Sequence, residues 1–280
     1  VMNNQNDTIK AVFFDIDGTL LDLKEHKLPE STRRALAILK RKGIKVFIAT
    51  GRSPYLIKRS LEELRKLSPD GFITLNGQYC LADGEVVRAH SFPVESLEKL
   101  IPWLNDNDIT CSFVEADYTY RNRRSRALQE YVADGGHDPL NEAPIDTTDR
   151  IYEHPVYQLN PNIPDSLEDE FVHRLPGSRA VRWNPLLVDV IPDNGGKDKG
   201  IAAVLEHYGW TVDQCAAFGD AENDIDMLRF AGTGIAMGNG DDSVKAAADY
   251  VTSDIEEDGI AKGLAHIGLL TEDEMEEILK

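Results

Sequence analysis

Apolar, strand-like runs alternate with helical patterns at the start of this 280-residue chain, and this alternation constrains the fold more than any other feature. The runs at 11–14, 44–49 and 72–75 are rich in β-branched and aromatic side chains, which predicts buried strands. Helical spacing of apolar residues covers 30–42, and Ser53-Pro54 predicts the start of a second helix that reaches about residue 67. This order of elements is typical of a parallel sheet covered by helices.

The pattern changes in the middle of the chain. From 84 to 184 the sequence has short apolar stretches, several prolines and scattered charges, which indicates an α+β insertion. The α/β alternation returns with a strand at 186–191 and continues to the end. We therefore expect a doubly wound, mostly parallel α/β domain built from 1–83 and 185–280, with a second domain at 84–184 inserted into it.

Composition limits the partners that this chain can have. The formal net charge of −19 and the lack of a basic stripe argue against a nucleic-acid partner. No apolar run approaches the ~18 residues of a membrane span, and the polar first ten residues show no signal-peptide pattern. The three cysteines are far apart and in no metal-binding spacing, so we expect reduced thiols and a cytoplasmic protein. The oligomeric state stays open, and a monomer is plausible.

Polar residues gather where the predicted strands end. Asp15 and Asp17 follow the first strand, Thr50 the second, Asn76 the third, and Asp220 a later one. Ligands of open α/β sheets bind beyond the carboxyl ends of the strands. Each residue alone is a weak signal, because Asp, Asn and Gly are common in turns and helix caps. Together, in this order and on these elements, they indicate one site.

Four motifs resemble those of the haloacid dehalogenase superfamily. They are Asp15-Ile16-Asp17-Gly18-Thr19-Leu20, Thr50-Gly51-Arg52, a lysine near Gly196, and Gly219-Asp220-Ala221-Glu222-Asn223-Asp224. Asn76-Gly77, Asp258-Gly259 and the place of the insertion resemble the Cof-type branch (class IIB), which is rich in sugar-phosphate phosphatases. The insertion resembles that branch's C2-type α/β cap in position and size only.

The resemblance implies a Mg²⁺-dependent phosphatase of small phosphorylated metabolites. It makes Asp15 the nucleophile that carries the phosphoryl group, and Asp17 the acid that protonates the leaving oxygen and later the base that activates water. Two side chains at i and i+2 of an extended strand end point the same way, which suits both tasks. The implied Mg²⁺ ligands are the Asp15 carboxylate, the Asp17 carbonyl and the Asp220 carboxylate, with Asp224 supporting them from outside.

The same resemblance assigns the phosphate-binding groups, which are Thr50, Gly51, Arg52, Asn76, Lys197 and Asn223. Two lysines qualify for the catalytic position, and the spacing to Gly209 favours Lys197 over Lys199. Arg52 either forms a local salt bridge or faces the active site.

The insertion is expected to cover the site and to choose the leaving group. Its candidate pocket or packing residues are Tyr118, Tyr120, Arg121, Arg182 and Trp183. The arginines from 121 to 126 indicate a solvated face, or else contact with an anionic substrate.

Two other functions stay open. One is a phosphomutase of the same superfamily, and the other is a non-catalytic module that binds phosphometabolites. A dehalogenase of this superfamily would not need a second aspartate, so the presence of Asp17 favours phosphate chemistry. The physiological substrate is not predicted.

Overall fold

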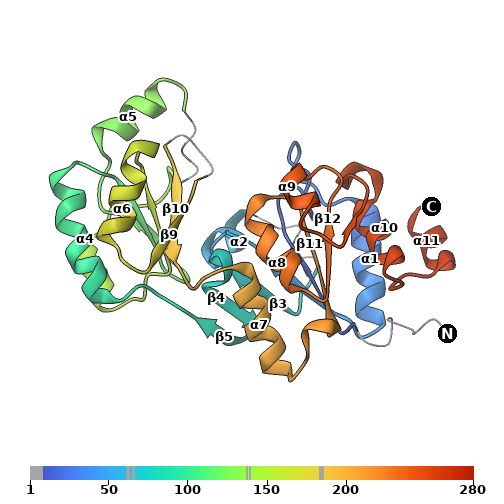
Figure 1. Cartoon of the computed structure of the whole chain (residues 1–280). Coiled ribbons are helices and arrows are strands. Elements are labelled where there is room, and N and C mark those ends of the chain that lie inside the picture. Colours follow the sequence, from blue (N-terminus) through green and yellow to red (C-terminus); the bar gives the residue numbers. More distant parts are fainter. Residues whose placement is uncertain (1–8, 61–63, 65–66, 137, 139, 183–185) are drawn as a thin grey trace. The chain divides into compact units, whose positions relative to one another are not determined.

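The computed structural model describes residues 9–60, 64, 67–136, 138, 140–182 and 186–280. The chain forms two compact units, each with its own sheet (Figure 1). One comprises Val1–Arg52, Lys58–Arg88 and Gly196–Lys280, and the other comprises Ser53–Ile57 and Ala89–Gly195. The predicted domain boundaries at 84 and 184 stay a prediction.

The first unit is built on an eight-stranded sheet with the order β13-β12-β11-β1-β2-β3-β4-β5. Strand β1 lies between β11 and β2 and is parallel to both, and β3 and β12 extend the parallel part on either side. The strands are β1 (Ala11–Phe14), β2 (Lys45–Ala49), β3 (Gly71–Thr74), β4 (Tyr79–Ala82), β5 (Glu85–Ala89), β11 (Cys215–Gly219), β12 (Thr233–Ala236) and β13 (Tyr250–Val251). The predicted α/β class and mostly parallel sheet are confirmed.

Helices cover both faces of this sheet, as Figure 1 shows for α7 and α8 on one side and α1 and α10 on the other. Alternate residues of β1 therefore serve two cores, because successive side chains of a strand point to opposite faces. Phe13 stacks on Phe47 and Phe14 stacks on Phe218, each pair with ring centroids 5.0 Å apart. The helices of this unit are α1 (Glu30–Arg41), α7 (Lys197–Tyr208), α8 (Ile225–Phe230), α9 (Asp242–Lys245), α10 (Gly259–His266) and α11 (Glu272–Ile278), and the division into units falls within α2 (Pro54–Ser60).

Helix ends follow the local sequence. Thr271 and Glu274 form a capping box at the start of α11, in which each side chain accepts the other residue's backbone N–H. Gly209, left-handed at φ 66°, ends α7. The helix predicted from Ser53 begins as α2, and part of its predicted C-terminal half, at 61–63 and 65–66, lies outside the described residues.

The second unit contains a five-stranded antiparallel sheet with the order β7-β6-β8-β10-β9. Helices α4 and α6 pack on an apolar face that includes Phe113, Leu159 and Val190. Its elements are α4 (Val94–Asp106), β6 (Cys111–Val114), β7 (Thr119–Arg121), α5 (Arg126–Ala133), β8 (Gln158–Pro161), α6 (Glu168–Arg174), β9 (Ser178–Arg182) and β10 (Val188–Pro192).

Two expectations about strands need correction. The strand predicted at 186–191 forms as β10, but it pairs antiparallel with β8 and β9 and is not part of the parallel sheet. Its apolar pattern specifies a strand with a buried face and carries no information about the sheet that it joins. Strands β4 and β5, which extend the large sheet beyond β3, were not predicted from the sequence.

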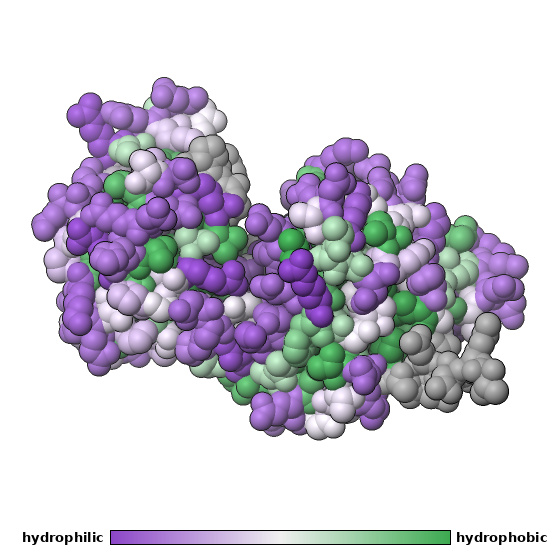
Figure 2. Space-filling model, in the orientation of Figure 1, coloured by the Kyte–Doolittle hydropathy of each residue, from purple (hydrophilic) through white to green (hydrophobic). Residues whose placement is uncertain are grey.

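The face of the molecule in Figure 2 is mostly hydrophilic, with hydrophobic residues in small groups. Large exposed apolar side chains come from separate parts of the chain, for example Leu23, Val132 and Leu279. Within the described ranges, no helix is long and apolar enough to cross a bilayer. All three cysteines are buried and free of disulfides.

Candidate active site

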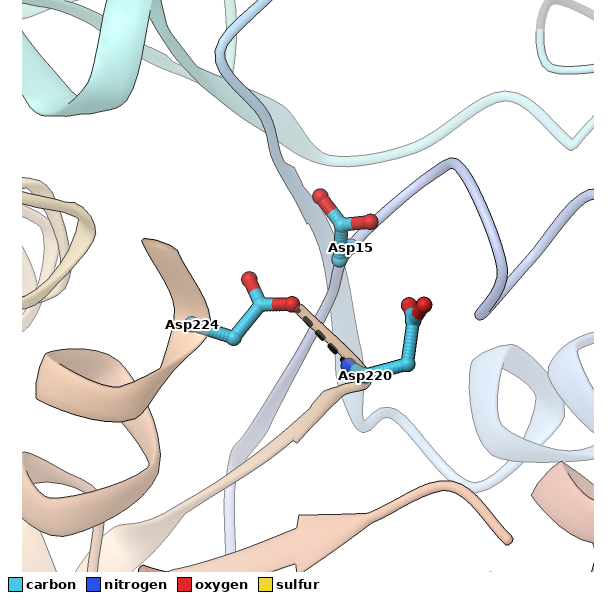
Figure 3. Close-up of side chains that lie close together, drawn as sticks. All are labelled: Asp15, Asp220 and Asp224. Carbon is cyan, nitrogen blue, oxygen red and sulfur yellow. Dashed lines mark hydrogen bonds between the residues drawn. The ribbon is translucent and has the colours of Figure 1, made fainter. Parts of the chain in front are cut away.

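Three acidic side chains converge at the carboxyl ends of β1 and β11 (Figure 3). Asp15 follows β1, and its N–H donates to the carbonyl of Phe218 in β11 at 3.0 Å. Asp220 follows β11, and Asp224 lies one turn further on, directly before α8. Each offers a carboxylate oxygen within 4.8 Å of the others, and all three residues are buried. Residues some two hundred positions apart in the sequence thus form one cluster.

Neighbouring groups fix two of these carboxylates. Thr19 donates its hydroxyl hydrogen to Asp220 Oδ1 at 2.6 Å. Asp224 Oδ2 accepts the backbone N–H groups of Asp220 and Ala221, both at 3.0 Å. Asp224 therefore shapes the loop that carries Asp220. Its role as a residue that supports the metal ligands from outside stays a prediction.

Glycine is required where the first acidic loop passes Asp220. Gly18 has φ +87°, and a Cβ atom at this position would lie 2.1 Å from Asp220 Oδ2. Asn239 holds the same loop from the other side, because its amide donates to the Gly18 carbonyl at 2.8 Å and its oxygen accepts the Ile255 N–H at 2.9 Å. Thr19 and Asn239 were not predicted as supporting residues, although Thr19 lies inside the first motif.

Lys197, the first residue of α7, is fully buried and joins two of the acids. Its Nζ lies 2.5 Å from Asp15 Oδ1 and 2.6 Å from Asp224 Oδ1. Burial lowers the pKa of Lys197, but these two carboxylates outweigh it and raise the pKa above its usual value. Lys199 is 54% exposed in its side chain and pairs with Asp198 at 3.0 Å. The structure thus brings Lys197, and not Lys199, to the acidic cluster.

The cluster has more negative than positive charge. Burial raises the pKa of Asp15, and Lys197 only partly opposes this. Burial also raises the pKa of Asp220 to about 6, against the effect of the Thr19 hydrogen bond. In the described part of the chain, no hydrogen bond reaches Asp15 Oδ2 or Asp220 Oδ2. Free carboxylate oxygens with an uncompensated charge are the donor set that a hard divalent cation prefers.

Asp17 faces a different partner from Asp15. Its two oxygens accept Nε and Nη2 of Arg52 at 2.8 and 2.7 Å, a bidentate pair that is about one-third exposed. The Asp17 carboxylate still lies close enough to Asp220 to contribute to its raised pKa. Arg52 thus forms a salt bridge, and because its partner Asp17 is itself a predicted site residue, the alternative that Arg52 faces the active site stays a prediction.

The loop after β2 is held by a left-handed turn after β3. Leu75, Asn76 and Gly77 have φ values of 53°, 51° and 85°. The Asn76 N–H donates to the Thr50 carbonyl and the Leu75 N–H to the Arg52 carbonyl, both at 3.1 Å. The turn therefore fixes the backbone of the second motif.

The predicted phosphate-binding residues of three loops meet around this turn. Asn223 donates its side-chain amide to Asn76 Oδ1 at 3.2 Å. Gly51 approaches the same amide so closely that a Cβ atom at its position would lie 3.1 Å from Asn76 Nδ2. Thr50 is buried, and its hydroxyl accepts the Arg52 N–H at 3.1 Å.

The candidate pocket residues of the insertion have partners within their own unit. Arg121 is fully buried and makes a bidentate pair with Asp138 at 2.8 and 2.6 Å, so the predicted solvated arginine face is wrong at this residue. Tyr118 and Tyr120 lie beneath the Arg150 guanidinium. Arg182 pairs with Glu168 at 2.7 Å, and Trp183 lies outside the described residues.

Comparisons with known proteins agree with this fold. Residues 12–264 match the family of haloacid dehalogenase-like hydrolases. A Bacillus subtilis (strain 168) protein named "Putative phosphatase YkrA" is 37% identical over 262 residues, which span 93% of this chain and 98% of that protein. "Pyridoxal phosphate phosphatase YbhA" of Escherichia coli (strain K12) is 31% identical, over 91% of this chain and 97% of that protein. The solved structure of the subclass IIB sugar phosphatase BT4131 is 37% identical, with a TM-score of 0.78 over 93% of this chain and 100% of that one.

The class of protein is defined by the parallel sheet, by the acidic cluster at its carboxyl edge and by similarity over nearly the whole chain. The chain belongs to the haloacid dehalogenase-like hydrolase family. Within the family it is a phosphatase of the Cof-type subclass IIB branch, which acts on small phosphorylated metabolites.

Proposed function

We propose that this phosphatase hydrolyses phosphate monoesters, with sugar phosphates as the first candidates, through an aspartyl-phosphate on Asp15 and with Mg²⁺ as its metal. The observation that carries the proposal is the buried cluster of Asp15, Asp220 and Asp224. Two of these carboxylates, Asp15 and Asp224, accept hydrogen bonds from the Lys197 ammonium. This geometry supports phosphoryl transfer, because such reactions depend on positioning and on neutralising charge.

The first half-reaction transfers the phosphoryl group to the protein. The Asp15 carboxylate attacks phosphorus, an Asp15 O–P bond forms, and the bond between phosphorus and the leaving oxygen breaks. Protonated Asp17 donates its proton to that oxygen, which departs as an alcohol. Lys197 lies directly beside the attacking carboxylate and offsets charge on the transferring group.

The second half-reaction regenerates the nucleophile. The Asp17 carboxylate takes a proton from water, the water oxygen attacks phosphorus, and the Asp15 O–P bond breaks. Inorganic phosphate leaves, and Asp15 and Asp17 return to their starting protonation states. Asp17 thus donates a proton in the first half-reaction and removes one in the second, so one acid–base carboxylate in the first motif is enough.

The free oxygens of Asp15 and Asp220, together with the Asp17 carbonyl, would hold the metal. When bound, Mg²⁺ supplies positive charge that polarises the phosphoryl group. Thr50, Asn76, Asn223 and the Gly51 backbone are proposed to bind phosphoryl oxygens. The role of the insertion as a cap that selects the leaving group stays a prediction.

The substrate class is supported by similarity only. BT4131 is described as a sugar phosphatase and YbhA as a pyridoxal phosphate phosphatase, so related chains use different leaving groups. A screen of sugar phosphates, pyridoxal phosphate and nucleotide precursors for inorganic phosphate release should rank these classes for this chain.

The test compares the wild type with Asp15→Asn in the presence of Mg²⁺ and in EDTA. We expect metal-dependent phosphate release from the wild type and none from the variant, and acid quenching should trap a phosphorylated protein only in the wild type. A variant with near-normal release would refute the covalent route. An isomeric sugar phosphate formed without free phosphate would instead favour the mutase.

A further inference from the structure

We infer that Arg52 is a positioning residue for Asp17, whose guanidinium fixes the carboxylate that moves protons during turnover. The inference rests on the proposed acid–base role of Asp17. The two residues lie in the loops after β1 and β2, which are neighbouring parallel strands. Arg52 is therefore expected to act through Asp17 and not through the substrate.

The geometry of the pair is suited to orienting a carboxylate. Arg52 Nε bonds Asp17 Oδ2 at 2.8 Å and Nη2 bonds Oδ1 at 2.7 Å. Two parallel N–H···O bonds set both the direction and the rotation of the carboxylate plane, which a single bond or a lysine does not. The basic side chain of His26 also lies near Asp17, but its Nδ1 is further away, 3.9 Å from Oδ1.

The main chain of Arg52 is itself held at both ends. Its N–H donates to Thr50 Oγ1 at 3.1 Å, and its carbonyl accepts the Leu75 N–H at 3.1 Å. The guanidinium therefore extends from a fixed backbone, and an orientation set by the β2 and β3 loops is transmitted to Asp17.

Pairing with Arg52 leaves Asp17 able to react. Each carboxylate oxygen has two acceptor positions, and the guanidinium occupies one on each. The remaining positions can take a proton from water or present one to a leaving oxygen. Without Arg52 the carboxylate would sample other rotamers, and proton transfer requires donor and acceptor within hydrogen-bond reach.

The test is a double-mutant cycle with Arg52→Gln, Asp17→Asn and the double variant. Two substrates are compared: 4-nitrophenyl phosphate, whose leaving group needs little protonation, and a simple alkyl phosphate, whose leaving group needs a proton. Because general acid catalysis contributes ~10²–10⁴-fold, we expect Arg52→Gln to lower kcat/KM for the alkyl ester by roughly 10–100-fold. The loss with the aryl ester should be about threefold or less. In the Asp17→Asn background, Arg52→Gln should change kcat/KM by no more than about twofold.

Two further variants separate positioning from general effects. Arg33→Gln is the matched control, because Arg33 also makes a bidentate pair, with Glu30, but on the exposed surface of α1. Arg33→Gln should leave kcat/KM unchanged for both substrates. Arg52→Ala should regain alkyl phosphatase activity when guanidinium ion is added at concentrations that do not unfold the protein, and this rescue should be absent in Asp17→Asn/Arg52→Ala.

Effects that multiply in the cycle would overturn the inference, because Arg52 would then act independently of Asp17, for example on the phosphoryl group. Equal losses with both esters would overturn it too. A wild type without metal-dependent phosphate release, or an active Asp15→Asn variant, would instead overturn the proposed function. The two failures are thus distinguishable.

Discussion

Replacement of Lys197 by methionine should disable the site, because it removes the buried ammonium group that lies beside the acidic cluster. Methionine has a similar length and fills the same space without charge. Lys197 Nζ lies 2.5 Å from Asp15 and 2.6 Å from Asp224, so the variant leaves two buried carboxylates without their counter-charge. Lys199→Met is the matched control, because that side chain is 54% exposed and pairs outside the cluster.

The magnitude follows from these contacts. At an effective dielectric constant of about 20, each close contact corresponds to roughly 6 kcal/mol of attraction, most of which offsets the cost of burying the ions. Removing one partner of a buried ion pair costs about 3–5 kcal/mol of unfolding free energy. Loss of a preorganised group that stabilises transition-state charge lowers kcat by roughly 10²–10³-fold.

The loss of stability in Lys197→Met should depend on pH. Burial raises the pKa of Asp15 and Lys197 opposes this, so the variant should have a still higher pKa at Asp15. A carboxyl group with a raised pKa in the folded state stabilises the fold below its unfolded pKa, and this contribution is lost as the pH rises through the folded value. Because burial raises the pKa of Asp15 to about 8 in the wild type, both proteins lose this contribution equally below that pH, and the deficit of Lys197→Met should be larger at pH 9 than at pH 5.

The assays are steady-state kinetics with 4-nitrophenyl phosphate and urea denaturation of the metal-free proteins at the two pH values. Near-normal turnover in Lys197→Met, with loss in Lys199→Met, would refute the assignment of the lysine. An equal stability deficit at pH 5 and pH 9 would refute the electrostatic argument.

Three further results are expected. Gly18→Ala should lower kcat at least about tenfold, because its Cβ would lie 2.1 Å from Asp220 Oδ2. Gly43→Ala is the control, because Gly43 also has a positive φ but its Cβ would have no atom within 4 Å. This variant should lower only the free energy of unfolding, by about 1–2 kcal/mol. Mg²⁺ should raise the melting temperature more at pH 8 than at pH 5.5, because the pKa of Asp220 is about 6 and bound ligands must be deprotonated; an equal rise at both values would contradict this. Arg121→Met should lower the free energy of unfolding by about 3–5 kcal/mol in urea denaturation, and Arg121→Met/Asp138→Leu should lower it much less. An equal loss in the double variant would contradict this, because it would mean that the buried pair itself stabilises the insertion.

Much of the large sheet could be predicted from sequence, because its buried strands are short apolar runs between helical patterns. Strand β1 is fully buried, and its apolar run identifies it without knowledge of its neighbours. The sheet membership of β10 could not be predicted in this way, since pairing depends on which strands lie beside it.

The candidate site was partly predictable for a related reason. Asp15 and Asp220 follow strand ends, and parallel strands bring such ends to one edge of a sheet. The partners of charged side chains are set by tertiary structure, so neither the Arg121–Asp138 pair nor the partner of Arg52 was visible in the sequence.

The left-handed backbone at Leu75 has a consequence for sequence tolerance. A non-glycine residue in this conformation costs roughly 1–2 kcal/mol, and burial of a leucine side chain contributes about 1.5–3 kcal/mol in the opposite direction. Glycine would relax the main chain but leave a hole, whereas valine or isoleucine would fill the hole but resist the dihedral angle. A saturation library at this position should therefore yield few active clones, although the side chain touches no reacting atom.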